Sequence, residues 1–153
     1  LGAVTSSLVS NSIGAGERNA VFPLCHKVIR LGLYIGTPLI IIALSLHPLI
    51  IGAYTENPVV KQIAWQPYVV MLLNYFFALP GYILNAVTGT GATKTVFFFQ
   101  VITTIAYLFC LWGLSNLNVR LATYWSVEYL YVIMLGIQSF IYLKLYNSKN
   151  NRI

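Results

Sequence analysis

The sequence predicts an all-α integral membrane protein, a helical bundle with four complete transmembrane helices and the end of a fifth. Of the 153 residues, 58% are hydrophobic and only 8% are charged, whereas soluble domains carry about a quarter charged residues. Four apolar runs are each long enough to cross a bilayer, which takes about 20 residues in a helix. The basic residues also divide unequally between the two ends of these runs, as they do in membrane proteins.

Residues 1–13, LGAVTSSLVSNSI, are too short to span a bilayer, and we interpret them as the end of a helix. Small residues recur along this segment, as they do where membrane helices pack closely. Because the chain starts with Leu, we expect it to be a fragment of a longer protein. No charged leader with a cleavage site is present, so we expect no signal peptide.

Four expected spans follow, and together with the first segment they assign residues 1–146 to one transmembrane unit. Their bounds are 31–54, 63–87, 95–117 and 122–146. Residues 147–153 are polar, and we expect them to form a loose cytoplasmic tail.

The basic residues give an independent check on the number of crossings. With four crossings, loop 14–30, the turn near residue 90 and the C-terminus share one side of the membrane. Seven basic residues lie on that side and two on the other: Arg18, Lys27, Arg30, Lys94, Lys144, Lys149 and Arg152 against Lys61 and Arg120. This bias marks cytoplasmic loops, so we expect a multi-pass protein of the plasma (inner) membrane with those segments in the cytoplasm.

The distribution of charge and the few Cys and His residues argue against nucleic-acid binding, a disulfide and a metal site. The net charge is +6, but it is scattered between apolar runs, so we expect the lipid bilayer as a partner and no nucleic acid. Cys25 and Cys110 predict no disulfide. His26 and His47 have no Cys or acid nearby, so we predict no metal site.

The stretch NAVTGTGATKT, at residues 85–95, is similar in composition to a phosphate-binding loop but does not match the residue pattern of one. A Walker loop ending at Lys94 would need glycine at positions 88 and 93, and both are threonine. The alternative is a tight cytoplasmic turn at Gly89 and Gly91, since glycine tolerates positive φ, with Lys94 facing headgroups or helix-end carbonyls. NSIGAGE, at residues 11–17, repeats the pattern with Gly14 and Gly16.

These two glycine turns carry a resemblance to a known family. VSNSIGAGERNAV, at residues 9–21, followed one span later by NAVTGTGATKT, resembles the C-terminal lobe of multidrug and toxic compound extrusion (MATE) transporters. The resemblance implies two six-helix lobes around a cleft that opens alternately to each side. Residues 1–13 would end the eighth helix, and the four spans would be helices nine to twelve.

The resemblance also implies a function and partners. Family members export small organic, often cationic, compounds in exchange for inward Na⁺ or H⁺, with no other cofactor. The partner of this chain would be the missing N-terminal lobe of the same protein. No acid lies between Lys61 and Lys94, and Ala92 stands where the family usually has Asp, so the coupling ion would bind mainly outside this fragment.

Glu128 is the sole acid inside an expected span, and its depth matters. It lies about 9 Å along the helix from Ala122, at ~1.5 Å per residue. A charge at the bilayer centre costs roughly 2.5–3.5 kcal/mol on insertion scales. Glu128 is therefore either a proton- or cation-attracting group in the outer cleft, or a carboxylate near the outer headgroups paired with Arg120.

Three further residues are candidates for lining the cleft. Asn74 lies near the middle of its span, with Tyr75 beside it and Gln66 two turns earlier. An unpaired amide is costly in hydrocarbon, so Asn74 should face protein or water. It would contact substrate, or it would form a hydrogen bond between helices, which averages about 0.6 kcal/mol.

Pro80 and Gly81 form the best hinge candidate, because proline removes a backbone donor and glycine follows at once. A static kink that serves packing is the alternative.

The function classes left open differ in the polar groups they need. A flippase for lipid-linked precursors or polysaccharide would need a basic cleft lining, and no Lys or Arg lies at mid-span. A membrane enzyme needs clustered catalytic groups, and a channel needs a polar stripe; the sequence has neither. An inactive truncated fragment is a further alternative. Together with the resemblance, which implies a cation-coupled exporter, these observations favour a transporter that is not an enzyme.

Overall fold

A computed structural model describes residues 1–150 of the chain, with side chains described up to residue 148. These residues form helices joined by short turns, with no strand among them. The elements are α1 (Gly2–Gly14), η1 (Arg18–Ala20), α2 (Val21–Ser45), α3 (His47–Tyr54), α4 (Pro58–Ala78), η2 (Leu79–Gly81), α5 (Tyr82–Gly89), α6 (Thr93–Ser115) and α7 (Leu121–Asn150), where η1 and η2 are short 3₁₀ turns.

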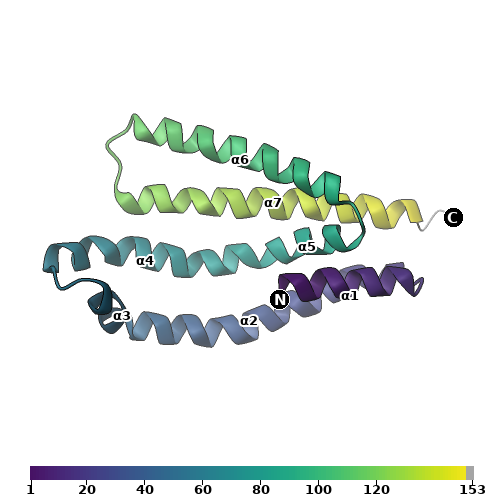
Figure 1. The fold of residues 1–153 in the computed structure, drawn as a ribbon, viewed down its shortest axis with the longest axis horizontal. Helices are drawn as coiled ribbons and strands as arrows, with labels where there is room; N and C mark the ends of the chain where they lie inside the picture. The colour runs from purple at the N-terminus through teal and green to yellow at the C-terminus, as the bar shows by residue number, and fades with distance from the viewer. Residues whose placement is uncertain (151–153) are drawn as a thin grey trace.

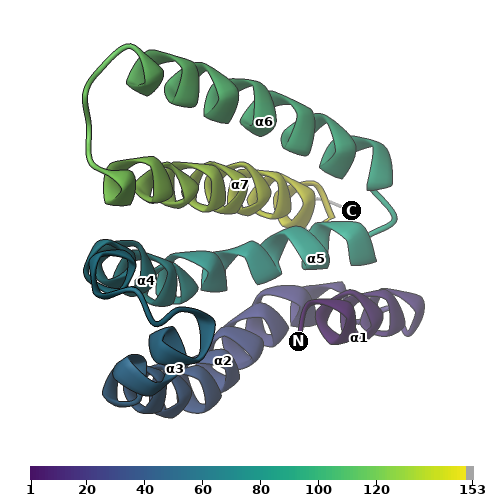
Figure 2. The same ribbon diagram turned by 60° about the vertical axis from the view of Figure 1, so that its left-hand side comes forward.

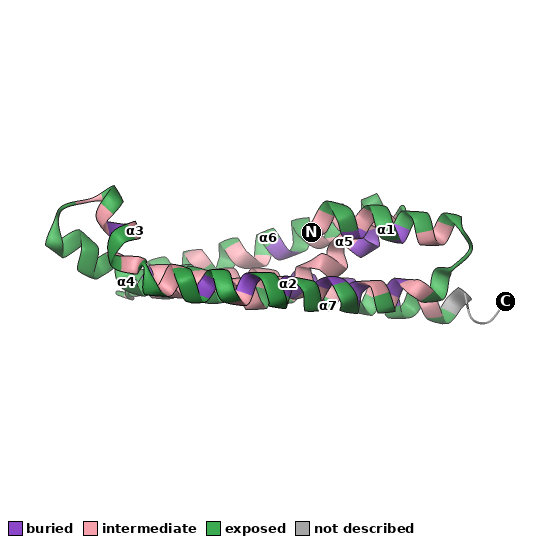
Figure 3. Cartoon of the chain, turned by 90° about the horizontal axis from the view of Figure 1, so that it is seen from below, coloured by how far each residue is buried: buried purple, intermediate pink, exposed green. Residues whose placement is uncertain are grey.

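The long helices lie side by side in one open layer, in the order α2, α4 with α5, α7 and α6 (Figures 1 and 2). Helix α1 packs beside α5. Figure 3, seen from below, shows how thin this layer is. Both glycine turns and the end of α7 lie at one end of the layer, and α3 and the α6–α7 loop lie at the other (Figure 1). This arrangement puts the basic residues of loop 14–30 and Lys94 at the same end.

Four stretches are long and apolar enough to cross a membrane: Arg18–Ser45, Pro58–Gly89, Thr93–Ser115 and Leu121–Ser148. The expected fold class, an all-α membrane protein with four spans, is therefore confirmed. Most apolar side chains on these helices point outward; within α6, which is described throughout, Thr103 is the one buried residue. Such a surface suits lipid as the solvent, because each helix satisfies its own backbone hydrogen bonds.

Helix α2 starts at Val21, so the expected loop over 14–30 is wrong for its second half. Val21, Cys25 and Val28 are buried at helical spacing, while His26 and Lys27 are exposed on the other side. The helix therefore begins before the apolar run, with an amphipathic segment. A search for apolar runs does not find such a segment.

The expected span at 31–54 is interrupted, and the expected span at 63–87 changes helix type within its length. The first breaks at Leu46, because Pro48 in the first turn of α3 lacks a backbone N–H. The second begins at Pro58, where the Asn57 side chain accepts a hydrogen bond from the Val59 N–H (2.9 Å), and it tightens into η2 at Pro80. Helix α7 runs on to Asn150, so residues 147–150 are helical and not a loose tail; residues 151–153 lie outside the described residues.

The buried core sits at the end of the layer that carries the glycine turns. It joins α1, α2, α5 and α7 through Val9, Val21, Cys25, Ala86, Val87 and Leu143. Towards the other end, α4 and α6 each pack along α7, and their contacts include stacked rings and single hydrogen bonds from tyrosine hydroxyls to backbone carbonyls.

Candidate functional site

The two glycine turns have the same backbone conformation. Gly16 and Gly91 have φ of 83° and 85°, and the residues before them, Ala15 and Thr90, are both in the right-handed helical region. The N–H of Gly16 donates to Ile13 O (3.0 Å), as the N–H of Gly91 donates to Thr88 O (2.9 Å). Both positions need glycine because a Cβ would strain a positive φ.

The turns differ in their surroundings. A Cβ added at Gly89 would lie 2.5 Å from the Ser6 carbonyl oxygen, whereas one added at Gly14 would meet nothing within 4 Å. Gly2 lies opposite Asn85 in the same interface, so α1 and α5 run parallel and both end at the glycine turns. Lys94 is exposed in the first turn of α6.

Tyr75 is held in the α2–α4 interface. Its hydroxyl donates to the Gly32 carbonyl oxygen (2.7 Å), and its ring lies where a side chain at Gly36 would be. Gly32 and Gly36 form a G-x-x-x-G pair, a spacing that lets membrane helices approach closely. The spacing is visible in the sequence and could have indicated this contact.

Asn74 lies on a different face of α4, toward α7. The hydroxyl of Tyr129 on α7 donates to Val70 O (2.6 Å), and the Tyr129 ring stacks on Phe77 at 4.7 Å between centroids. Val70, Asn74 and Phe77 share one face at helical spacing. The Oδ1 atom of Asn74 is buried there with no hydrogen-bond partner among the described residues. The Oδ1 atom therefore does not make the hydrogen bond between helices that was considered for Asn74.

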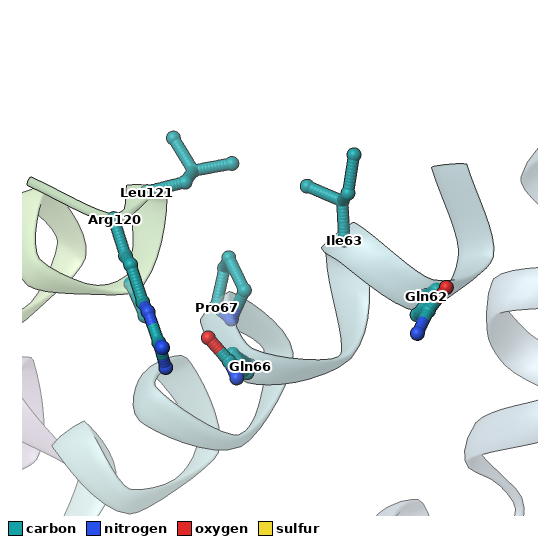
Figure 4. Close-up of a pocket in the computed structure, with 7 residues that line it drawn as sticks. Gln62, Ile63, Gln66, Pro67, Arg120 and Leu121 are labelled. Atoms are coloured by element: carbon teal, nitrogen blue, oxygen red, sulfur yellow. The ribbon is translucent and has the colours of Figure 1, made fainter. Parts of the chain in front are cut away.

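Gln66 lies two turns before Asn74 on that face, and it lines a cavity of about 330 Å³ at the far end of the layer. Figure 4 shows the Arg120 side chain running along this cavity toward Gln66 and Pro67. Gln62 adds a second amide to the wall.

Glu128 lines a separate cavity of about 170 Å³ between α6 and α7, together with Tyr107, Leu111, Tyr124 and Trp125. The Tyr107 hydroxyl is close enough to interact with the Glu128 carboxylate. Arg120 does not line this cavity, and no ion pair joins it to Glu128 within the described part of the chain. Tyr107 escapes sequence reasoning because it comes from another helix. Tyr124 and Trp125 lie on α7 itself, and their spacing from Glu128 could have indicated them.

The four candidate residues thus do not converge on one site. Tyr75 faces α2, Asn74 and Gln66 face α7 from α4, and Glu128 faces α6 from α7. The hinge candidate coincides with a local change of helix type: Pro80 and Gly81 lie in the 3₁₀ turn η2, which joins α4 to α5. Gly136 of α7 packs against it, since a Cβ there would lie 3.1 Å from Pro80 Cβ.

Comparison with known proteins identifies the family. The MatE family model matches residues 1–112, a range that includes both glycine turns, η2 and nearly all of α6. No curated protein and no solved structure matches the chain. The chain therefore belongs to the MatE family of membrane transporters.

Proposed function

We propose that this chain forms part of the C-terminal lobe of an exporter that moves organic, often cationic, compounds in exchange for inward Na⁺ or H⁺. The observation that carries the proposal, beyond membership of the family, is the change to a 3₁₀ turn at η2. Transporters use irregular helices near the binding site, around which one part of the molecule moves against the other. Here the 3₁₀ turn lies within a crossing segment and against a glycine of the neighbouring helix.

The packing around η2 permits such a movement. Gly81 has open space where a Cβ would lie, and Pro80 cannot donate a helical hydrogen bond. Helix α5 is fixed to α1 by the close approach at Gly89, while α4 is fixed to α2 by Tyr75. Both halves of the span also pack on α2 and α7, but only α5 is held by α1, and η2 is where the two halves would bend.

The proposal is tested with the protein from the complete reading frame, reconstituted into vesicles that are loaded with a cationic dye. An inward Na⁺ or H⁺ gradient should drive dye export, and collapsing both gradients should stop it. Absence of any dependence on either gradient would reject coupled exchange.

Pro80→Ala tests the hinge itself. Alanine restores the missing N–H and favours a continuous helix, so we expect transport to slow several-fold while dye binding is kept. Pro38→Ala is the matched control, because Pro38 lies within α2 without interrupting it. Equal transport rates for the two variants would leave η2 as a static kink.

A flippase of the same superfamily, for a lipid-linked precursor or polysaccharide, is the second candidate, and the Arg120 cavity is the observation in its favour. A guanidinium beside two amides suits an anionic headgroup. Arg120→Gln should then impair transport of a lipid-linked anionic precursor and leave export of the cationic dye unchanged.

A further inference from the structure

We propose that Glu128, Tyr107, Tyr124 and Trp125 form a binding site for the positively charged head of an organic ammonium compound. The inference deepens the proposed export function and rests on it for the identity of the cargo. It stands on a different part of the molecule from the hinge, so each can fail alone.

The carboxylate is placed to attract a cation. Glu128 is the one acid within the four crossing segments, and no Lys, Arg or His lines its cavity. Arg120, which directly precedes α7, lines the other cavity, beside Gln66 (Figure 4). A carboxylate that is half-buried within a crossing segment needs a compensating charge or a proton.

The walls of the cavity are aromatic and held in position. The Tyr124 hydroxyl donates to the Leu114 carbonyl oxygen (3.0 Å), which fixes the ring of Tyr124 beside α6. The Tyr107 ring packs edge-on against Tyr131, with centroids 5.8 Å apart. Trp125 remains 43% exposed, which leaves its ring free to cover a ligand. Aromatic faces around a cation are the arrangement that recognises quaternary ammonium groups.

The size of the cavity sets what can enter. At about 170 Å³ it is smaller than the roughly 300–1,000 Å³ of pockets that enclose drug-sized ligands. It therefore holds an ammonium head, and the remainder of the compound lies outside it. On the other side of the α6–α7 pair, a larger groove of about 530 Å³ has no charged side chain in its lining, so it offers a cation no comparable attraction.

The test compares two ligands that differ only in charge. One is (3-hydroxyphenyl)trimethylammonium, and the other is 3-tert-butylphenol, in which carbon replaces the charged nitrogen. Binding of each to the purified protein from the complete reading frame is measured by equilibrium dialysis. We expect Glu128→Gln to weaken binding of the ammonium compound about ten-fold and to change binding of the phenol by less than about two-fold.

Matched variants separate a binding role from a structural one. Glu56→Gln removes the same charge from the exposed α3–α4 loop and should leave the binding of both ligands unchanged. Tyr107→Phe keeps the ring and should weaken ammonium binding less than Tyr107→Leu does. If Glu128→Gln does not fold, Glu128→Asp replaces it and should keep the preference for the ammonium compound.

The outcomes distinguish this inference from the proposed function. Unchanged ammonium binding in Glu128→Gln, or equal weakening of both ligands, overturns the cation site and leaves gradient-driven export standing. The predicted selective loss, in a protein that shows no gradient-driven export, supports the site and rejects the transport proposal. Failure of the unaltered protein to bind the ammonium compound overturns the site.

Discussion

Tyr75 and Asn74 are neighbours in the sequence with opposite surroundings, and together they show what decides a polar residue's role in a membrane helix. The Tyr75 hydroxyl finds a backbone carbonyl on α2 because Gly32 and Gly36 leave room for the ring. Asn74 faces α7, where its oxygen has no partner among the described residues. Of the two, Asn74 remains the candidate for contact with a substrate.

The Tyr75 contact predicts a clear stability effect. Gly36→Ala places a methyl group into the Tyr75 ring, and overpacking of this kind costs about 1–3 kcal/mol. Gly113→Ala is the control, because nothing lies within 4 Å of its added Cβ and alanine favours the helix by roughly 0.5–1 kcal/mol. Thermal unfolding in detergent should show that Gly113→Ala is the most stable protein, the unaltered protein is next and Gly36→Ala is the least stable. A Gly36→Ala protein as stable as the unaltered one would contradict the interface.

At the level of helices, the apolar runs predicted how many crossings there are but not where each helix starts or breaks. The four runs correspond to four crossing segments, because length and hydropathy alone determine whether a helix can span. The first ten residues of α2 were not predicted as part of a span, because the residues on their polar face lower the hydropathy of the segment. The break at Leu46 depends on one proline, whereas Pro38 and Pro67 lie inside continuous helices. Hydropathy contains no information that separates these cases.

The glycine turns give an element-level prediction with an internal control. Gly89→Ala brings a Cβ against the Ser6 carbonyl oxygen and Val9 Cβ, so α1 must move away from α5, and we expect a loss of about 1–3 kcal/mol. Gly14→Ala, at the matching position of the other turn, meets nothing within 4 Å and should be neutral. Unfolding measured by near-ultraviolet circular dichroism in detergent decides between them. Similar stabilities for the two variants would mean that α1 does not pack closely on α5.

At the level of the whole molecule, the candidate site could be predicted only in part. Glu128 stands out in the sequence as an acid in an apolar run, but its cavity is built by residues from α6 and α7 together. The cavity depends on how α6 and α7 align with each other, and the residue pattern of one helix does not predict that alignment. Likewise, residues 66, 74, 75 and 128 were all predicted as candidates for lining the cleft, and the structure places them on different faces of their helices.

The proposed orientation follows from the same overall layout. The structure gathers both glycine turns and the start of α6 at one end of the layer (Figure 1). The α6–α7 loop, which contains Asn118, lies at the other. We propose that the first end is cytoplasmic, since the charge bias marks that side. Export of a compound across the membrane requires these two ends to lie on opposite sides of a bilayer.

Labelling with a membrane-impermeant maleimide tests this claim most directly. Single cysteines are introduced as Ala15→Cys or Asn118→Cys, both at exposed positions, in the complete protein with Cys25 and Cys110 replaced by alanine. In intact cells Asn118→Cys should label at once, and Ala15→Cys should label only after the membrane is permeabilised. Equal labelling of both cysteines from one side would contradict the four-crossing membrane topology.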